Sequence, residues 1–150
     1  MSNNKNPREK QTIGRREIVS FPDLDLQGLV AKIDTGAYTT ALHCSHVRVE
    51  DGVLFFRLLD EEHPEYQDRD HRFAVFHQKE VRNSFGESEL RYIIKTRIRM
   101  GRRIIKCIIS LSDRGNMRYP VLIGRRLLKN RFVVDVSQEN LLTENETKSF

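Results

Sequence analysis

The amino-acid sequence predicts an all-β domain, either a barrel or a sandwich-like fold, with one short helix near the C-terminus. Between residues 13 and 137, apolar and polar residues mostly alternate with a period of two, which is the pattern of half-buried strands. These segments are short and are separated by turn residues, and residues 124–130 have the pattern of a helix of at most two turns. Many short strands with one late helix are typical of an all-β domain.

The first two expected strands, residues 17–21 and 27–33, are joined through a turn at Pro22-Asp23. The second strand is largely apolar from residue 29 onward. We therefore expect it to be buried and to deliver Asp34 at its end.

A hairpin is expected next, with strands at residues 46–50 and 53–58. Asp51-Gly52 between two alternating segments is the strongest short-range hairpin signal. Residues 60–72 then break the alternation with charged residues and a proline, and we expect them to form a solvated loop.

The second half of the chain contains the most regular alternation. A strand at residues 80–85 precedes residues 91–100, where apolar residues and Thr96 alternate mainly with Arg and Lys. Gly101-Arg102 places Gly where a type II′ turn requires it, before a returning strand at residues 105–111. Two further strands flank the expected helix, at residues 120–123 and 132–136.

The composition is that of one soluble globular domain. The chain has 150 residues, of which 38% are hydrophobic and 31% charged. We expect the domain to span residues 13–137, between a disordered segment at 1–12 and a flexible segment at 138–150. With no apolar run of membrane-spanning length and no apolar core in the first ten residues, the sequence favours a cytoplasmic protein.

The net charge indicates the class of partner, and the cysteine count excludes some disulfide and metal sites. Lys and Arg number 26 against 21 Asp and Glu, a net charge of +5 that suits an acidic partner, whether nucleic acid or acidic peptide. Cys44 and Cys107 are too few for a disulfide framework or a four-thiolate metal site.

The candidate catalytic residue is Asp34, in the triplet Asp34-Thr35-Gly36. A carboxylate at the end of a buried strand is held rigidly, and Gly36 lets another chain approach closely. The same triplet is also an ordinary turn sequence, because Asp bonds nearby backbone groups and Gly supplies positive φ. The surrounding sequence has to decide between these two interpretations.

Two stretches taken together resemble the retropepsin-like aspartic peptidases. Residues 33–37, Ile-Asp-Thr-Gly-Ala, are followed about 90 residues later by residues 121–128, Val-Leu-Ile-Gly-Arg-Arg-Leu-Leu. That family pairs an Asp-Thr-Gly-Ala loop with an apolar strand and glycine entering a short helix. The longer strings 34–43 and 113–125 resemble a bacterial branch labelled ATP-dependent zinc protease, which is linked to ATP-grasp glutamate ligases that modify ribosomal protein.

The resemblance, which spans residues 14–136, implies a closed retropepsin-like barrel and an aspartic endopeptidase. Because one chain carries one Asp-Thr-Gly, it implies a homodimer in which Asp34 of each chain activates water. The implied supporting loop is Thr35, Gly36 and Ala37; the implied substrate-binding residues are Gly36, Gly86 and Ile123; and the implied structural residues are Gly124 and Arg125.

The resemblance also implies a flap, a hairpin that closes over substrate, near residues 83–90 with its tip around Gly86. Glu87 and Glu89 stand there where viral flaps are rich in glycine. The implied substrate is a peptide or protein, acidic or glutamate-extended, and no cofactor is expected. No Gly-rich phosphate loop ending in Gly-Lys-Ser or Gly-Lys-Thr occurs, so the ATP of the label is assigned to a partner ligase.

Two alternatives remain. A zinc-dependent hydrolase or metal-binding domain would use His43, Cys44, His46 or the segment from His63 to His71, although no His-Glu-x-x-His motif is present. A non-catalytic barrel that binds RNA or the ribosome would use a stripe of cationic side chains, namely Arg91, Lys95, Arg97, Arg99 and Lys106.

Overall fold

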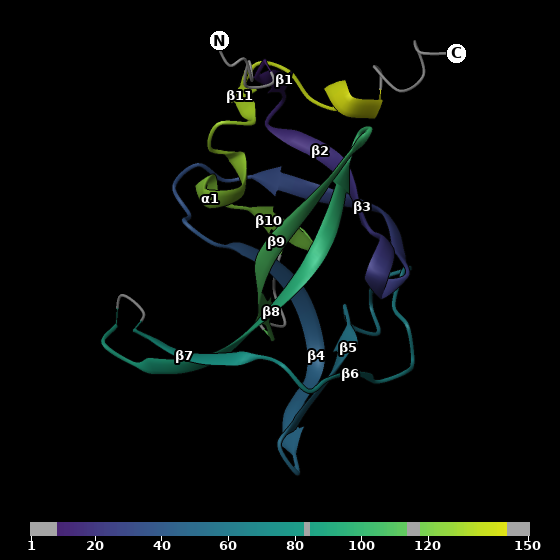
Figure 1. Ribbon diagram of the computed structural model, residues 1–150, viewed down its shortest axis with the longest axis vertical. Coiled ribbons are helices and arrows are strands. Elements are labelled where there is room, and N and C mark those ends of the chain that lie inside the picture. Colours follow the sequence, from purple (N-terminus) through teal and green to yellow (C-terminus); the bar gives the residue numbers. More distant parts are fainter. Residues whose placement is uncertain (1–8, 83–84, 114–117, 144–150) are drawn as a thin grey trace, which may run out of the picture.

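Six strands close into a barrel, which confirms the predicted all-β barrel of retropepsin type. The computed structural model describes residues 9–82, 85–113 and 118–143 (Figure 1). Strand β10 pairs with both β3 and β4, and this closes the ring in the order β10, β3, β2, β8, β9, β4. The six strands are β2 (Arg16–Phe21), β3 (Leu26–Ile33), β4 (Thr40–Glu50), β8 (Ser88–Met100), β9 (Arg103–Ser112) and β10 (Val121–Ile123).

The remaining elements extend the barrel at its ends. Strands β5 (Val53–Leu58) and β6 (His71–Phe73) continue the sheet beyond β4, and β7 (His77–Arg82) pairs with β8 in an arm that projects from the barrel (Figure 1). A separate parallel pair joins β1 (Gln11–Ile13) to β11 (Phe132–Val134). Residues 141–143 are helical. The two labelled helices are a 3-10 turn, η1 (Pro22–Leu24), and the predicted short helix, α1 (Arg125–Leu128). Neither has the length and apolar composition needed to span a membrane, as holds for every helix in the described ranges.

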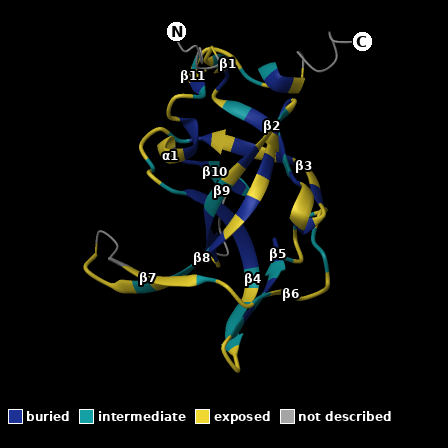
Figure 2. Ribbon diagram, viewed as in Figure 1, coloured by how far each residue is buried: buried dark blue, intermediate teal, exposed yellow. Residues whose placement is uncertain are grey.

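The β8–β9 hairpin has the predicted alternation. Ile94, Ile98 and Met100 are buried. Lys95, Arg97 and Arg99 between and beside them are exposed, as the alternating colours along β8 show (Figure 2). The apolar face of this hairpin contributes to the core inside the barrel. Gly101 begins the turn with φ of 64°, and Met100 pairs with Arg103 across it.

The predicted hairpin at Asp51-Gly52 is also present. Both residues have positive φ, 50° and 77°, as a type I′ turn requires. Several bounds differ from the expectation. Strand β4 begins at Thr40, whereas a strand was expected from residue 46. The strand expected at residues 80–85 begins at His77, and His71, expected in the loop, lies in β6, which pairs with β5.

The charged loop before β6 is tied to the barrel by arginines. Asp70 receives hydrogen bonds from Arg48 Nη2 at 2.8 Å and from Arg57 Nε at 3.2 Å. These guanidinium groups lower the pKa of Asp70 to about 2. The loop is solvated, as expected, but is held in place by these ion pairs.

Segments on both sides of the expected 13–137 domain take part in the fold. Gln11 pairs with Phe132 in the β1–β11 sheet, and Leu142 is buried. Residues 1–8 and 144–150 lie outside the described residues. Described residues beyond both expected bounds therefore contribute to the fold.

A buried carboxylate holds the two ends of the domain together. Glu17, with no exposed surface, accepts main-chain hydrogen bonds from Gly14 at 2.7 Å, Leu141 at 3.1 Å and Leu142 at 2.9 Å. We call this arrangement the Glu17 clasp. It satisfies a carboxylate that would otherwise be costly to bury.

Replacing Glu17 with Ala should destabilise the fold, because three main-chain N–H groups lose their acceptor. We expect the free energy of unfolding to fall by about 1–3 kcal/mol, measured by urea denaturation. Glu50→Ala is the matched control, since Glu50 is exposed and pairs with Arg48 at the surface. It should leave the free energy of unfolding nearly unchanged. Equal losses in the two variants would contradict a structural role for the clasp.

Candidate active site

The Asp34 loop begins where β3 ends beside β10. These two strands are parallel, and Ile33 lies opposite Ile123. Asp34 N donates to Ile123 O at 2.8 Å, which continues the ladder by one bond. The loop then turns back on itself, because Ala37 N donates to Asp34 O at 3.1 Å. The main chain of Asp34 is thus fixed on both sides.

The carboxylate of Asp34 is oriented by its own loop. Gly36 N donates to Asp34 Oδ1 at 3.1 Å. Asp34 is half-buried, whereas Thr35 and Gly36 are exposed. Among the described residues, no ion pair joins Asp34 to another side chain. The loop therefore presents one carboxylate and an open glycine backbone at the protein surface.

Arg125, the first residue of α1, holds the Asp34 loop in place through hydrogen bonds. Arg125 N donates to Ala37 O at 2.8 Å, and Arg125 Nη1 donates to Gly36 O at 3.1 Å and Thr35 O at 3.4 Å. The Arg125 guanidinium also lies 5.5 Å from the ring centroid of Tyr38. One arginine thus satisfies three carbonyls of the loop.

Gly124 allows residues 38–40 to pack closely against the start of α1. Its N–H donates to Thr40 Oγ1 at 3.1 Å. A Cβ built on Gly124 would lie 2.7 Å from Tyr38 O and from Thr39 C, well inside van der Waals contact. Any side chain here would push residues 38–40 away from α1. The resemblance implied a structural role for Gly124, and this close approach is a steric argument for such a role.

Two of the expected substrate-binding residues, Ile123 and Gly86, lie outside the Asp34 loop. Ile123 is fully buried, so its side chain is not available to a substrate, and it supports the site through its carbonyl oxygen. Gly86 lies in the connection between β7 and β8 with φ of 80°, and a Cβ there would face open space. The range in which the flap was expected, residues 83–90, falls in the β7–β8 hairpin, and Asn83 and Ser84 of that range lie outside the described residues.

The zinc candidates do not converge. His43 is buried and its Nε2 lies 2.6 Å from Asp60 Oδ2, whereas His46 is exposed at a bulge with φ of 54°. Cys44 is fully buried, which raises the pKa of its thiol. In the part of the chain that the structure describes, no three His, Cys, Asp or Glu side chains are grouped to hold a metal.

In the cationic stripe of the RNA-binding alternative, the arginines have local partners and the two lysines line a cavity. Arg97 forms a bidentate pair with Asp23, with Nε–Oδ2 at 2.8 Å and Nη2–Oδ1 at 2.6 Å. Arg99 donates to Gly101 O at 3.2 Å. Lys95 and Lys106 line a cavity against α1 that the sequence did not predict, because α1 and β8–β9 are distant in the chain.

Comparisons with known proteins bear on the family and the fold of this chain. A family model described as RimB-like, retropepsin-like aspartic endopeptidase RimB, matches residues 12–145. A solved structure from Legionella pneumophila, protein Lpg0085 of unknown function, superposes with a TM-score of 0.68 over 89% of this chain and 99% of that chain. At 22% identity, this likeness shows the fold alone.

The curated relatives are longer proteins. One from Desulfotalea psychrophila is 29% identical over 149 residues, covering 93% of this chain and 31% of the relative. Another from Shewanella pealeana is 31% identical over 144 residues, covering 90% of this chain and 30% of the relative. Both are named "Probable alpha-L-glutamate ligase". This chain thus spans about a third of the length of the curated relatives that it matches.

Gly124→Ala should destabilise the protein, because the new methyl group overlaps the main chain of residues 38–39. We expect a loss of about 1–3 kcal/mol in the free energy of unfolding, measured by urea denaturation. Gly36→Ala is the matched control. A Cβ on Gly36 would contact only Asp34 Oδ1, at 3.4 Å, and so should cost little stability. If both variants were equally stable, the steric role of Gly124 would be wrong.

Proposed function

The chain belongs to the RimB-like family of retropepsin-like aspartic endopeptidases, and on this basis we propose that it hydrolyses peptide bonds as a homodimer with Asp34 of each protomer as the catalytic residue. The observation that carries the proposal is the fixed Asp34 loop. The Asp34 main chain is bonded to β10, and its carboxylate accepts a hydrogen bond from Gly36 N–H. Thr35 and Gly36 are exposed, so a second copy can meet the loop there.

The chemistry needs two carboxylates, and one chain supplies one in this loop. In the proposed dimer, the two Asp34 side chains face each other across the two-fold axis and share one proton, since two like charges a few Å apart cannot both ionise. The ionised carboxylate removes a proton from water, whose oxygen bonds to the scissile carbonyl carbon. The protonated carboxyl donates its proton to the carbonyl oxygen. Proton transfer to the leaving nitrogen then accompanies cleavage of the C–N bond.

The neighbouring residues take supporting roles in this proposal. Thr35 braces the two loops, Gly36 permits close approach and offers its backbone to substrate, and Ala37 anchors the loop to α1. The contacts of Arg125 with the carbonyls of Thr35 and Gly36 favour a structural role, as does the tight fit at Gly124. Gly86, in the β7–β8 arm, is the proposed flap residue that closes over the peptide.

We infer that the substrate is an acidic peptide, such as a glutamate-extended tail. Support comes from the names of the curated relatives, which describe a glutamate ligase, and from the net charge of +5. A ligase that adds glutamate forms the kind of bond that this peptidase would cut. The proposal therefore links the chain functionally to an ATP-grasp glutamate ligase.

Asp34→Asn should abolish hydrolysis of a glutamate-extended peptide while leaving the fold intact, because Asn cannot take a proton from water. Release of new amino termini from synthetic peptides measures the activity, and circular dichroism checks the fold. Asp51→Asn is the matched control, since Asp51 lies in the β4–β5 turn, where Asn tolerates positive φ equally well. Cleavage by the Asp34 variant would refute the proposal.

Chelation should leave this hydrolysis unchanged, because the proposed reaction uses no metal. The same peptide assay is run after dialysis against EDTA and again after zinc is added back. Loss of activity with EDTA and recovery with zinc would support the zinc-dependent alternative and contradict the aspartic mechanism.

Mixing wild-type protein with the Asp34→Asn variant tests the shared site. If protomers exchange at random, an equal mixture should retain about one quarter of the activity of the same total amount of wild type, because only the wild-type pairs are complete. Independent active sites would instead retain about one half in that mixture. Sedimentation velocity on the same samples reports whether dimers are present.

A further inference from the structure

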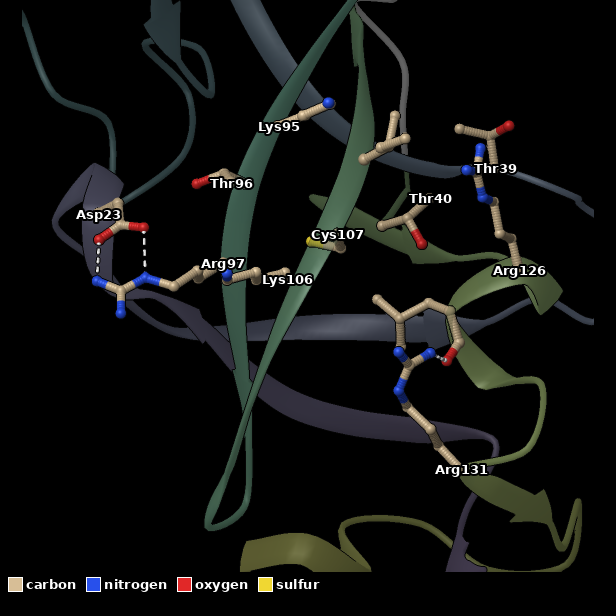
Figure 3. A pocket seen from close by; sticks show the side chains of 12 residues that line it. Asp23, Thr39, Thr40, Lys95, Thr96, Arg97, Lys106, Cys107, Arg126 and Arg131 are labelled. Atoms are coloured by element: carbon tan, nitrogen blue, oxygen red, sulfur yellow. Dashed lines mark hydrogen bonds and ion pairs between the residues drawn. The ribbon is translucent and has the colours of Figure 1, made fainter. Parts of the chain in front are cut away.

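A cavity lies between α1 and the β8–β9 hairpin, separate from the Asp34 loop. Its volume is about 530 Å³, within the range of small-molecule sites. None of residues 34–37 lines it. Figure 3 shows its lining, with Lys95 of β8 and Lys106 of β9 on one side, and Thr39, Arg126 of α1 and Arg131 on the other. Elements far apart in the sequence thus form one concave surface.

The lining of this cavity is strongly cationic. Five of its side chains are positively charged, and its one carboxylate, Asp23, is already paired with Arg97. Arg131 Nη1 donates to Leu127 O at 3.0 Å. Within the described ranges, the side chains of Lys95, Lys106 and Arg126 have no hydrogen bond or ion pair, and Arg126 lies 6.0 Å from the Tyr38 ring. Three unneutralised cations around one cavity favour an anionic occupant.

The remaining lining fits a small organic anion. Leu127, Ile108 and Cys107 supply apolar surface, and burial raises the pKa of the Cys107 thiol to about 12, so the thiol adds no negative charge at neutral pH. Thr40 Oγ1 accepts the N–H of Gly124 and keeps its own proton to donate.

We propose that this cavity is a binding site for a small phosphate-bearing molecule. A planar carboxylate is satisfied by a single guanidinium, whereas the cations here come from β8, from β9 and from α1 on the other side. Tetrahedral phosphate groups present oxygens in several directions and match such an arrangement. The apolar lining accommodates the organic part of the ligand.

Isothermal titration calorimetry with pyrophosphate tests the site, and inorganic phosphate and triglutamate are the comparison ligands. We expect saturable binding of one pyrophosphate per chain, weaker binding of inorganic phosphate, and weaker still of triglutamate. Lys106→Ala and Arg126→Ala should each weaken pyrophosphate binding about tenfold, since each removes one charged donor. Lys95→Ala provides an independent variant on the other strand.

Arg102→Ala is the matched control, because Arg102 is an exposed cation in the β8–β9 turn and does not line the cavity. It should change the affinity less than about twofold. The proposal is overturned if pyrophosphate does not saturate, if Arg102→Ala weakens binding as much as the cavity variants, or if triglutamate binds more tightly than pyrophosphate. The measurement does not depend on peptidase activity, so it can fail or succeed independently of the proposed function.

Discussion

The parallel pairing of β3 with β10 is the constraint on which the site depends. It places the end of one strand beside the end of another that lies about 90 residues away, and the bond from Asp34 N to Ile123 O continues this ladder into the loop. Immediately afterwards, Gly124 admits the backbone of residues 38–39 at a distance that no side chain allows. Arg125 can then reach the loop carbonyls. The geometry of Asp34 therefore follows from strand pairing and from one missing side chain.

The features that the sequence predicts well are local. The Asp51-Gly52 and Gly101-Arg102 turns need particular φ values that few residues supply, and the alternation along β8 records directly which face meets the core. The resemblance carried by residues 33–37 and 121–128 identified the two segments that meet at the site. In the second motif, Gly124 is the glycine that this contact requires.

The features that escaped prediction depend on contacts between distant segments. The short strands β1 and β6 exist because partners elsewhere in the chain complete their hydrogen bonds. Ile123 was assigned to substrate by the resemblance, and the burial of its side chain depends on the strands that close around β10. The cavity beside α1 could not be anticipated either, since its lining joins η1, β8, β9 and α1.

The cationic side chains divide into two groups with different consequences. Arg48, Arg57 and Arg97 are paired with carboxylates, so they organise loops and add little net field. Among the described residues, Lys95, Lys106 and Arg126 have no ion-pair partner, and all three line the cavity beside α1. An excess of five positive charges is modest for a chain of this size. The clustering of positive charge around the cavity therefore matters more for anion binding than the net charge of the whole chain.

The Glu17 clasp determines where this domain can be shortened. Two of its three hydrogen-bond donors, Leu141 and Leu142, come from the far end of the described chain, and Leu142 also packs beside Gly101. A fragment ending before Leu141 would keep the barrel strands and the Asp34 loop. It would nevertheless bury a carboxylate that retains only the N–H of Gly14. A boundary drawn from the strand pattern alone would thus remove part of the interior of the protein.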